Sequence, residues 1–171
     1  MIEFRNLRPD VLTRWFDFLC RDIFPHDPRE AVESMWNGND EHAFEGVFIA
    51  VQPDGHIIGS VMAGCRNMSV LGTPIRTGII SGVGVAAEFR GQGISAQLFA
   101  LCNAYMLSRD AKIAHLYSKP DTLAYYTKQG YLSLPRQPGE DFFRMYRVLS
   151  PFTLGDTPIA DTSSLIRFLQ K

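Results

Sequence analysis

The chain has 171 residues, enough for a single domain with a sizeable core. Its 17 lysines and arginines nearly balance 18 aspartates and glutamates, for a formal net charge of −1 at pH 7. This balance excludes the basic surface of a nucleic-acid-binding protein, so any polyanion must be met by a local site. The N-terminus is charged from its third residue, and no apolar run approaches the roughly 20 residues of a membrane span. We therefore expect a cytoplasmic protein with no nucleic-acid or membrane partner.

Three cysteines, Cys20, Cys65 and Cys102, are odd in number and widely spaced along the chain. No Cys-x-x-Cys pair or other metal-ligand spacing occurs. The pattern predicts free thiols in a reducing compartment and no metal site.

In the first half of the chain, apolar periodicity and turn residues predict alternating helices and strands. The expected order is a strand at 2–7, a helix from Pro9–Asp10 to before Pro25, a helix from Pro28 to Asn37–Gly38, a strand at 46–51, a hairpin turn at 52–55, and an extended segment from 56 to about 69.

The second half continues with a turn at 71–74 and a glycine-containing strand at 75–85. The expected order is then a helix from Gly91 to Ser108, a strand at 112–118, a helix from Pro120 that ends at Gly130, two strands at 131–135 and 142–149, and a loop followed by a short helix from Asp161.

Strands and helices in this order predict an α/β (α+β) fold with a mixed, mostly antiparallel central sheet and helices on both faces. We expect one domain over residues 1–150, with residues 151–171 forming a C-terminal loop and short helix of the same domain.

The stretch Arg90-Gly91-Gln92-Gly93-Ile94-Ser95 lies between a predicted strand and a predicted helix. A helix N-terminus carries partial positive charge and unpaired N–H groups, and glycine lets a phosphate approach the backbone. The stretch therefore predicts a diphosphate-binding cradle formed by the amides of residues 92–95. Arg90 would add charge or brace the loop. A glycine-rich turn without a ligand is the alternative interpretation.

A second glycine pattern, G-x-G-x-x-A at 82–87, matches the fingerprint of dinucleotide-binding proteins. That fingerprint requires a helix to open at its first glycine and an acidic residue about 20 positions later. The helical period begins several residues after Gly82, and Leu101, Cys102 and Asn103 stand in the expected acidic region. A nicotinamide- or flavin-dependent oxidoreductase is thus a rival hypothesis that the spacing disfavours.

The two stretches "VGVAAEFRGQGISAQLF" and "YYTKQGY" together resemble the GCN5-related N-acetyltransferase (GNAT) superfamily. Arg90, Gly93 and Ser95 match its phosphate-binding signature Q/R-x-x-G-x-G/A, with a serine at the last position. Tyr125, Tyr126, Gly130 and Tyr131 match its second signature, roughly F-Y-x-x-x-G-F. The likeness covers about residues 2–149 and implies the acyl-CoA N-acyltransferase fold.

The resemblance implies acetyl-CoA as the acyl donor, with no metal cofactor. It assigns the cofactor to Val83, Gly84, Val85, Arg90, Gly91, Gln92, Gly93, Ile94 and Ser95. The pantetheine arm would lie along the strand that ends at Val85, and a strand N–H would hold the thioester oxygen. Tyr126 is the expected catalytic residue, which hydrogen-bonds the leaving sulfur.

Two residues depart from the pattern of the family. Ser95 replaces a glycine or alanine, and Lys119 stands where many members have an asparagine that contacts the pantetheine arm. A looser likeness of residues 66–93 to the "enhanced intracellular survival" type of acetyltransferase suggests a subgroup.

The expected function is transfer of an acetyl group from acetyl-CoA to a primary amine on a small molecule or peptide. The alternative is a non-catalytic acyl-CoA-binding module of the same fold. No general base is assigned, and the carboxylates and histidine that remain candidates are Glu45, His56, Glu88, Glu140 and Asp141. Trp15, Met35 and Trp36 belong either to an acceptor pocket or to the core. The sequence leaves open whether the protein forms a homodimer.

Overall fold

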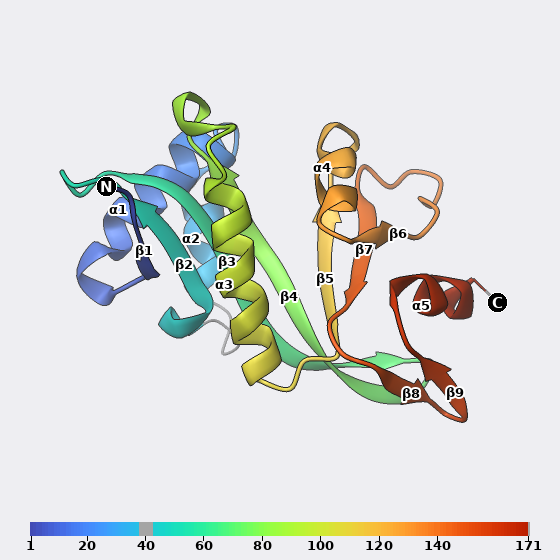
Figure 1. The fold of residues 1–171 in the computed structure, drawn as a ribbon. Helices are drawn as coiled ribbons and strands as arrows, with labels where there is room; N and C mark the ends of the chain where they lie inside the picture. The colour runs from blue at the N-terminus through green and yellow to red at the C-terminus, as the bar shows by residue number, and fades with distance from the viewer. Residues whose placement is uncertain (38–42, 171) are drawn as a thin grey trace. The chain divides into compact units, whose positions relative to one another are not determined.

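A computed structural model describes residues 1–37 and 43–170. Hydrogen-bonded neighbours give a seven-stranded sheet in the order β1-β2-β3-β4-β5-β7-β6, and a separate two-stranded sheet pairs β8 with β9 (Figure 1). The sheet is mixed and mostly antiparallel, and β4 and β5 form a parallel pair. The predicted fold class is confirmed.

The chain forms two compact units, and strands β3 and β4 contribute to both. Unit 1 comprises Met1–Gly64 and Ile80–Tyr105, and unit 2 comprises Cys65–Ile79 and Met106–Lys171. The predicted division into residues 1–150 and 151–171 stays a prediction.

The sheet of unit 1 is built from β1 (Glu3–Asn6), β2 (Val47–Val51), the first part of β3 (Ile57–Val70) and the last part of β4 (Thr73–Val85). All five residues of β2 are buried, as expected of a strand covered on both faces. The helical elements of the unit are η1 (Pro9–Val11), α1 (Leu12–Phe18), η2 (Leu19–Ile23), α2 (Arg29–Asn37), η3 (Phe44–Gly46), η4 (Ala87–Phe89) and most of α3 (Ile94–Ser108). Gly38, the other expected stop of the second helix, lies outside the described residues.

Two neighbouring residues of β3 show which helix covers which face. A Cβ on Gly59 would lie 3.1 Å from side-chain atoms of Ile94 and Leu98, so this face packs against α3. Ser60 points the other way, and its Oγ accepts a 2.8 Å hydrogen bond from the buried indole N–H of Trp15 in α1. Because successive strand residues face opposite sides, α1 and α3 cover opposite faces of unit 1 (Figure 1).

Unit 2 contains the parallel pairing of β4 with β5 (Ile113–Ser118), which runs from Thr77 to Ile79 of β4. β5 is antiparallel to β7 (Phe143–Val148), which pairs in turn with the short β6 (Leu132–Ser133). η5 (Pro120–Thr122) and α4 (Leu123–Lys128) follow β5, and Gly130 follows α4 at φ +85°, as expected of a residue just past a helix end.

The C-terminal segment differs from the sequence expectation in one respect. Where a loop was expected, β8 (Phe152–Leu154) and β9 (Thr157–Ile159) form a hairpin around Gly155. The expected helix α5 (Thr162–Leu169) follows, and Asp161 caps it in a reciprocal pair with Ser164. The buried cluster that joins these elements to the sheet consists of Ile75, Ile113, Leu154, Ile159 and Leu165.

Candidate functional site

The predicted cradle is a loop in unit 1 between η4 and α3. The sequence placed the helix start at Gly91, but α3 begins at Ile94. Gly91 and Gly93 have φ values of +77° and +76°, a region that ends helical geometry and favours glycine. The glycines therefore form the loop itself, and the first helical turn follows them.

This loop faces open space. A Cβ built on Gly91 or on Gly93 would meet no atom within 4 Å. Left-handed residues that alternate with residues of negative φ turn successive N–H groups toward one side of the chain, a geometry that binds anions. Gln92, between the two glycines, is not among the residues with positive φ.

The amides at the start of α3 have no partner in the part of the chain that the structure describes. Among the described residues, no protein acceptor bonds the N–H groups of residues 91–96, and the first amide to donate is that of Gln97, to Gly93 O at 3.2 Å. Several adjacent backbone donors beside open space are what an oxyanion of a diphosphate requires. The side-chain oxygen of Ser95 also forms no hydrogen bond with any residue that the structure describes, and the side chain is half-buried.

Arg90 braces the loop. Its Nε donates a 3.0 Å hydrogen bond to the carbonyl oxygen of Val85, at the end of β4. Of the two roles that the sequence allowed for Arg90, the structure shows this one. The Val85 carbonyl accepts this bond with one of its two lone pairs, and the cofactor contact expected of Val85 stays a prediction.

Gly82 and Gly84 of β4 each have a structural reason to be glycine, one in the backbone conformation and the other in packing. Gly82 adopts φ +58°, a left-handed conformation that favours glycine. A Cβ on Gly84 would lie 2.6 Å from Cγ1 of Ile23, so the absence of a side chain there lets η2 pack against the strand. Residues 82–85 are strand and are followed by η4, which is not the strand-to-helix geometry of the dinucleotide fingerprint.

Tyr126 lies in unit 2, on α4, and is 9% exposed. Its ring contacts the rings of Tyr125 and Tyr131, with centroids 5.1 and 6.3 Å away. Burial, together with the nearby Tyr125, raises the pKa of Tyr126 to about 12. The hydroxyl therefore stays protonated at neutral pH and can act as a hydrogen-bond donor. Tyr131, the last aromatic of the motif, is fully buried and belongs to the core.

The other residues that the sequence singled out are dispersed. Glu45, Glu88 and Asp141 are exposed, and Glu140 accepts from the backbone of Gln137 while its other oxygen lies 3.6 Å from Arg144. Lys119 is exposed before η5. None of these contacts identifies a base.

Among the aromatic candidates, Trp15 is fully buried and belongs to the core, Trp36 is half-buried, and Met35 is 37% exposed. His115, in β5, is buried against Tyr146 and shares a 3.0 Å hydrogen bond with Met145 O. Within the described ranges, no group of three or more His, Cys, Asp or Glu side chains could hold a metal ion. No helix in the same ranges has both the length and the apolar character to cross a membrane.

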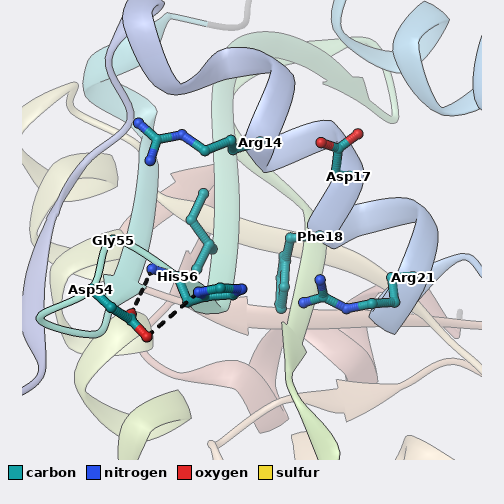
Figure 2. A pocket seen from close by; sticks show the side chains of 8 residues that line it. Arg14, Asp17, Phe18, Arg21, Asp54, Gly55 and His56 are labelled. Atoms are coloured by element: carbon teal, nitrogen blue, oxygen red, sulfur yellow. Dashed lines mark hydrogen bonds and ion pairs between the residues drawn. The ribbon is translucent and has the colours of Figure 1, made fainter.

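Sequence reasoning missed a cavity in unit 1 whose wall includes Arg14 and Arg21 (Figure 2). Arg14 in α1 and Arg21 in η2 lie on the exposed side of a helical segment that the sequence predicts from its apolar face. Their seven-residue spacing places them on one side of the helical segment. The sequence predicted the hairpin turn at 52–55, but no sequence signal placed that turn against these arginines.

Comparisons with known proteins agree with this fold. A family profile described as "Acetyltransferase (GNAT) domain" matches residues 3–133, more than half of the chain. No match was found among curated proteins.

Solved structures with the same fold include an acetyltransferase of the GNAT family from Staphylococcus aureus, with a TM-score of 0.68 and 14% identity over 87% of this chain and 99% of that one. The GNAT family N-acetyltransferase YhbS from Escherichia coli, in complex with CoA, gives a TM-score of 0.68 and 17% identity over 86% and 81% of the two chains. A chain of the NatC complex bound to Gag peptide and CoA gives a TM-score of 0.65 and 18% identity over 85% and 96%.

At these identities the solved structures show the fold, and the profile match shows the family. The suggested subgroup stays a prediction. The chain belongs to the GNAT family of acetyltransferases.

Proposed function

We propose that this protein transfers an acetyl group from acetyl-CoA to the primary amine of a small molecule or peptide. The observation that carries the proposal is the row of unpaired amides at residues 91–96 beside two left-handed glycines, in a member of an acetyltransferase family. The CoA bound to the E. coli relative supports the donor. The peptide and CoA in the NatC complex support an amine acceptor of this kind.

The cradle residues fit a diphosphate. A phosphate oxygen that accepts from backbone N–H groups at a helix start gains charge-assisted hydrogen bonds and the favourable end of the helix dipole. Glycine at 91 and 93 leaves the approach open, and Arg90 holds the loop to the end of β4 through Val85. In the proposal, the remaining backbone groups of residues 83–85 bind the pantetheine arm, and one N–H polarises the thioester carbonyl.

The acyl donor supplies a thioester carbon that a neutral amine can attack. A C–N bond forms, the C–S bond breaks, and the electron pair of the broken bond leaves with sulfur. The attacking nitrogen must lose a proton to a base or to water, because an amine near pKa 10 is mostly protonated at neutral pH.

Tyr126 acts on the departing sulfur in the proposal. Complete proton transfer from a hydroxyl of pKa about 12 to the thiolate of a thiol near pKa 8.5 is uphill by roughly 5 kcal/mol. We therefore propose that Tyr126 donates a hydrogen bond that stabilises the thiolate, while solvent supplies the proton after departure.

The alternative is a module that binds acyl-CoA without transferring the acyl group. The departures from the family pattern at Ser95 and Lys119 and the dispersed candidate bases favour it. Two measurements separate the functions. Calorimetry reports CoA binding, and thiol release from acetyl-CoA with a panel of primary amines reports transfer. Amine-dependent thiol release is expected, whereas CoA binding without release for any amine would establish the module.

A further inference from the structure

A cavity of about 220 Å³ lies between one helix face and the turn that joins β2 to β3 (Figure 2). Arg14, Asp17, Phe18 and Arg21 line it from α1 and η2, at the i, i+3, i+4 and i+7 spacing of a shared face. The turn contributes Asp54, Gly55 and His56, and β3 contributes its first residue, Ile57. All of these residues belong to unit 1, and none of them belongs to the cradle.

The cavity has an apolar floor and a charged rim. Phe18 is 1% exposed and Ile57 is 5% exposed, so the floor is part of the core. Figure 2 shows the side chains of Arg21 and His56 pointing toward one another from opposite sides, with the Phe18 ring between them.

Most of the charges at the rim are already paired. Arg29 binds the carboxylate of Asp17, and Arg21 donates from its Nε to Asp22 at 2.8 Å. Asp54 accepts from the backbone N–H of His56 at 3.0 Å, and its other oxygen lies 3.6 Å from the imidazole Nδ1.

Arg14 differs from the other charged groups of the rim. It forms no ion pair or hydrogen bond with any described residue, and its Nη1 lies 3.3 Å from where a Cβ on Gly55 would stand. Its planar guanidinium therefore lies at the turn, and its N–H donors have no acceptor among the described residues. A guanidinium in this state matches the two oxygens of a carboxylate.

The backbone beside the cavity is unusual. η2 is a π-helical turn, closed by a 2.8 Å bond from the Phe24 N–H to Leu19 O. Turns of this kind are rare and occur frequently at functional sites. Here the turn carries Arg21 on the cavity wall and Ile23 against Gly84 of β4.

We propose that this cavity is a binding site for a small carboxylate, held by the guanidinium of Arg14. The volume equals that of about seven water molecules and lies below the range of roughly 300–1,000 Å³ typical of larger ligands. It suits an acid of a few carbons, or the acid end of a longer molecule, and not a nucleotide. The carboxylate of Asp54, the neighbour of Gly55 in the turn, has further acceptor positions for an amino group of the same ligand. This inference does not depend on the acetyltransferase proposal.

The test is an NMR titration of the ¹⁵N-labelled full chain with propionate and with β-alanine, at constant ionic strength set by sodium chloride. The amide signals of Gly55 and His56 are expected to shift and saturate at millimolar concentrations. Arg14→Gln should weaken both affinities about tenfold, because a charged bidentate partner is lost. Arg8→Gln, which removes an exposed arginine paired with Asp10 outside the cavity, should leave them unchanged.

The two probes distinguish the sources of the carboxylate. Tighter binding of β-alanine assigns the site to an amino acid, and tighter binding of propionate assigns it to a simple acid; both results support the proposal when they depend on Arg14. Shifts that never saturate, or equal affinities in Arg14→Gln and the unmodified chain, would overturn it. Saturation by inorganic phosphate but by neither carboxylate would overturn it as well.

Discussion

Replacing Gly93 by valine tests the cradle by placing a branched side chain where the loop is open. The residue has φ +76°, and no atom lies within 4 Å of a Cβ there, so the change creates no clash inside the protein. An L-residue in the left-handed region costs about 1–2 kcal/mol, and a β-branched residue lies toward the upper end. The free energy of unfolding should fall by about 2 kcal/mol, in an otherwise intact fold.

The effect on CoA binding should be larger than this strain alone suggests. The side chain projects toward the space beside the unpaired amides, and each charge-assisted hydrogen bond lost is worth about 1.5–3 kcal/mol. The Kd for CoA should therefore rise about tenfold or more, as measured by calorimetry. Gly72→Val is the matched control, because Gly72 has φ +84° and equally open surroundings at the turn after β3. Equal CoA affinity in Gly93→Val and Gly72→Val, with both variants folded, would refute the cradle.

The remaining predictions concern one tyrosine and one histidine. Tyr126→Phe should lower kcat about 100-fold and change the Kd for CoA by less than about twofold. The control variant Tyr125→Phe should retain most activity. An unchanged kcat in Tyr126→Phe would contradict the role proposed for the Tyr126 hydroxyl. Burial lowers the pKa of His115 below its usual value. As the pH falls, the imidazole therefore takes up a proton in the unfolded chain before it does so in the folded chain. The free energy of unfolding, measured with urea, should therefore decrease as the pH drops below about 6.5. This pH dependence should be weaker in His115→Gln than in His26→Gln, the control variant at an exposed histidine. Identical pH profiles for the two variants would contradict the prediction.

Local sequence patterns predicted most of the elements because their causes are local. The all-apolar run of β2, the Asp161 cap of α5 and the glycine that ends α4 each act within a few residues. The C-terminal hairpin was missed although Gly155 and Asp156 supply turn residues between two short apolar segments, because those strands have only three residues each.

The candidate site was only partly predictable. The glycine spacing indicated the cradle, but the start of α3 at Ile94 depends on two backbone angles that the sequence does not display. The packing of Ile23 against Gly84 could not be predicted, because Ile23 lies far from Gly84 in the sequence. Likewise, Arg14 has no ion-pair partner among the described residues because the nearby carboxylates pair with other groups. Those pairings depend on the folded chain and could not be predicted from the sequence.

A crystal structure of the protein with CoA tests the central claim most directly. The proposed function predicts diphosphate oxygens within about 2.7–3.2 Å of backbone nitrogens among residues 91–96. A diphosphate bound elsewhere on the chain, with those nitrogens facing only solvent, would contradict it.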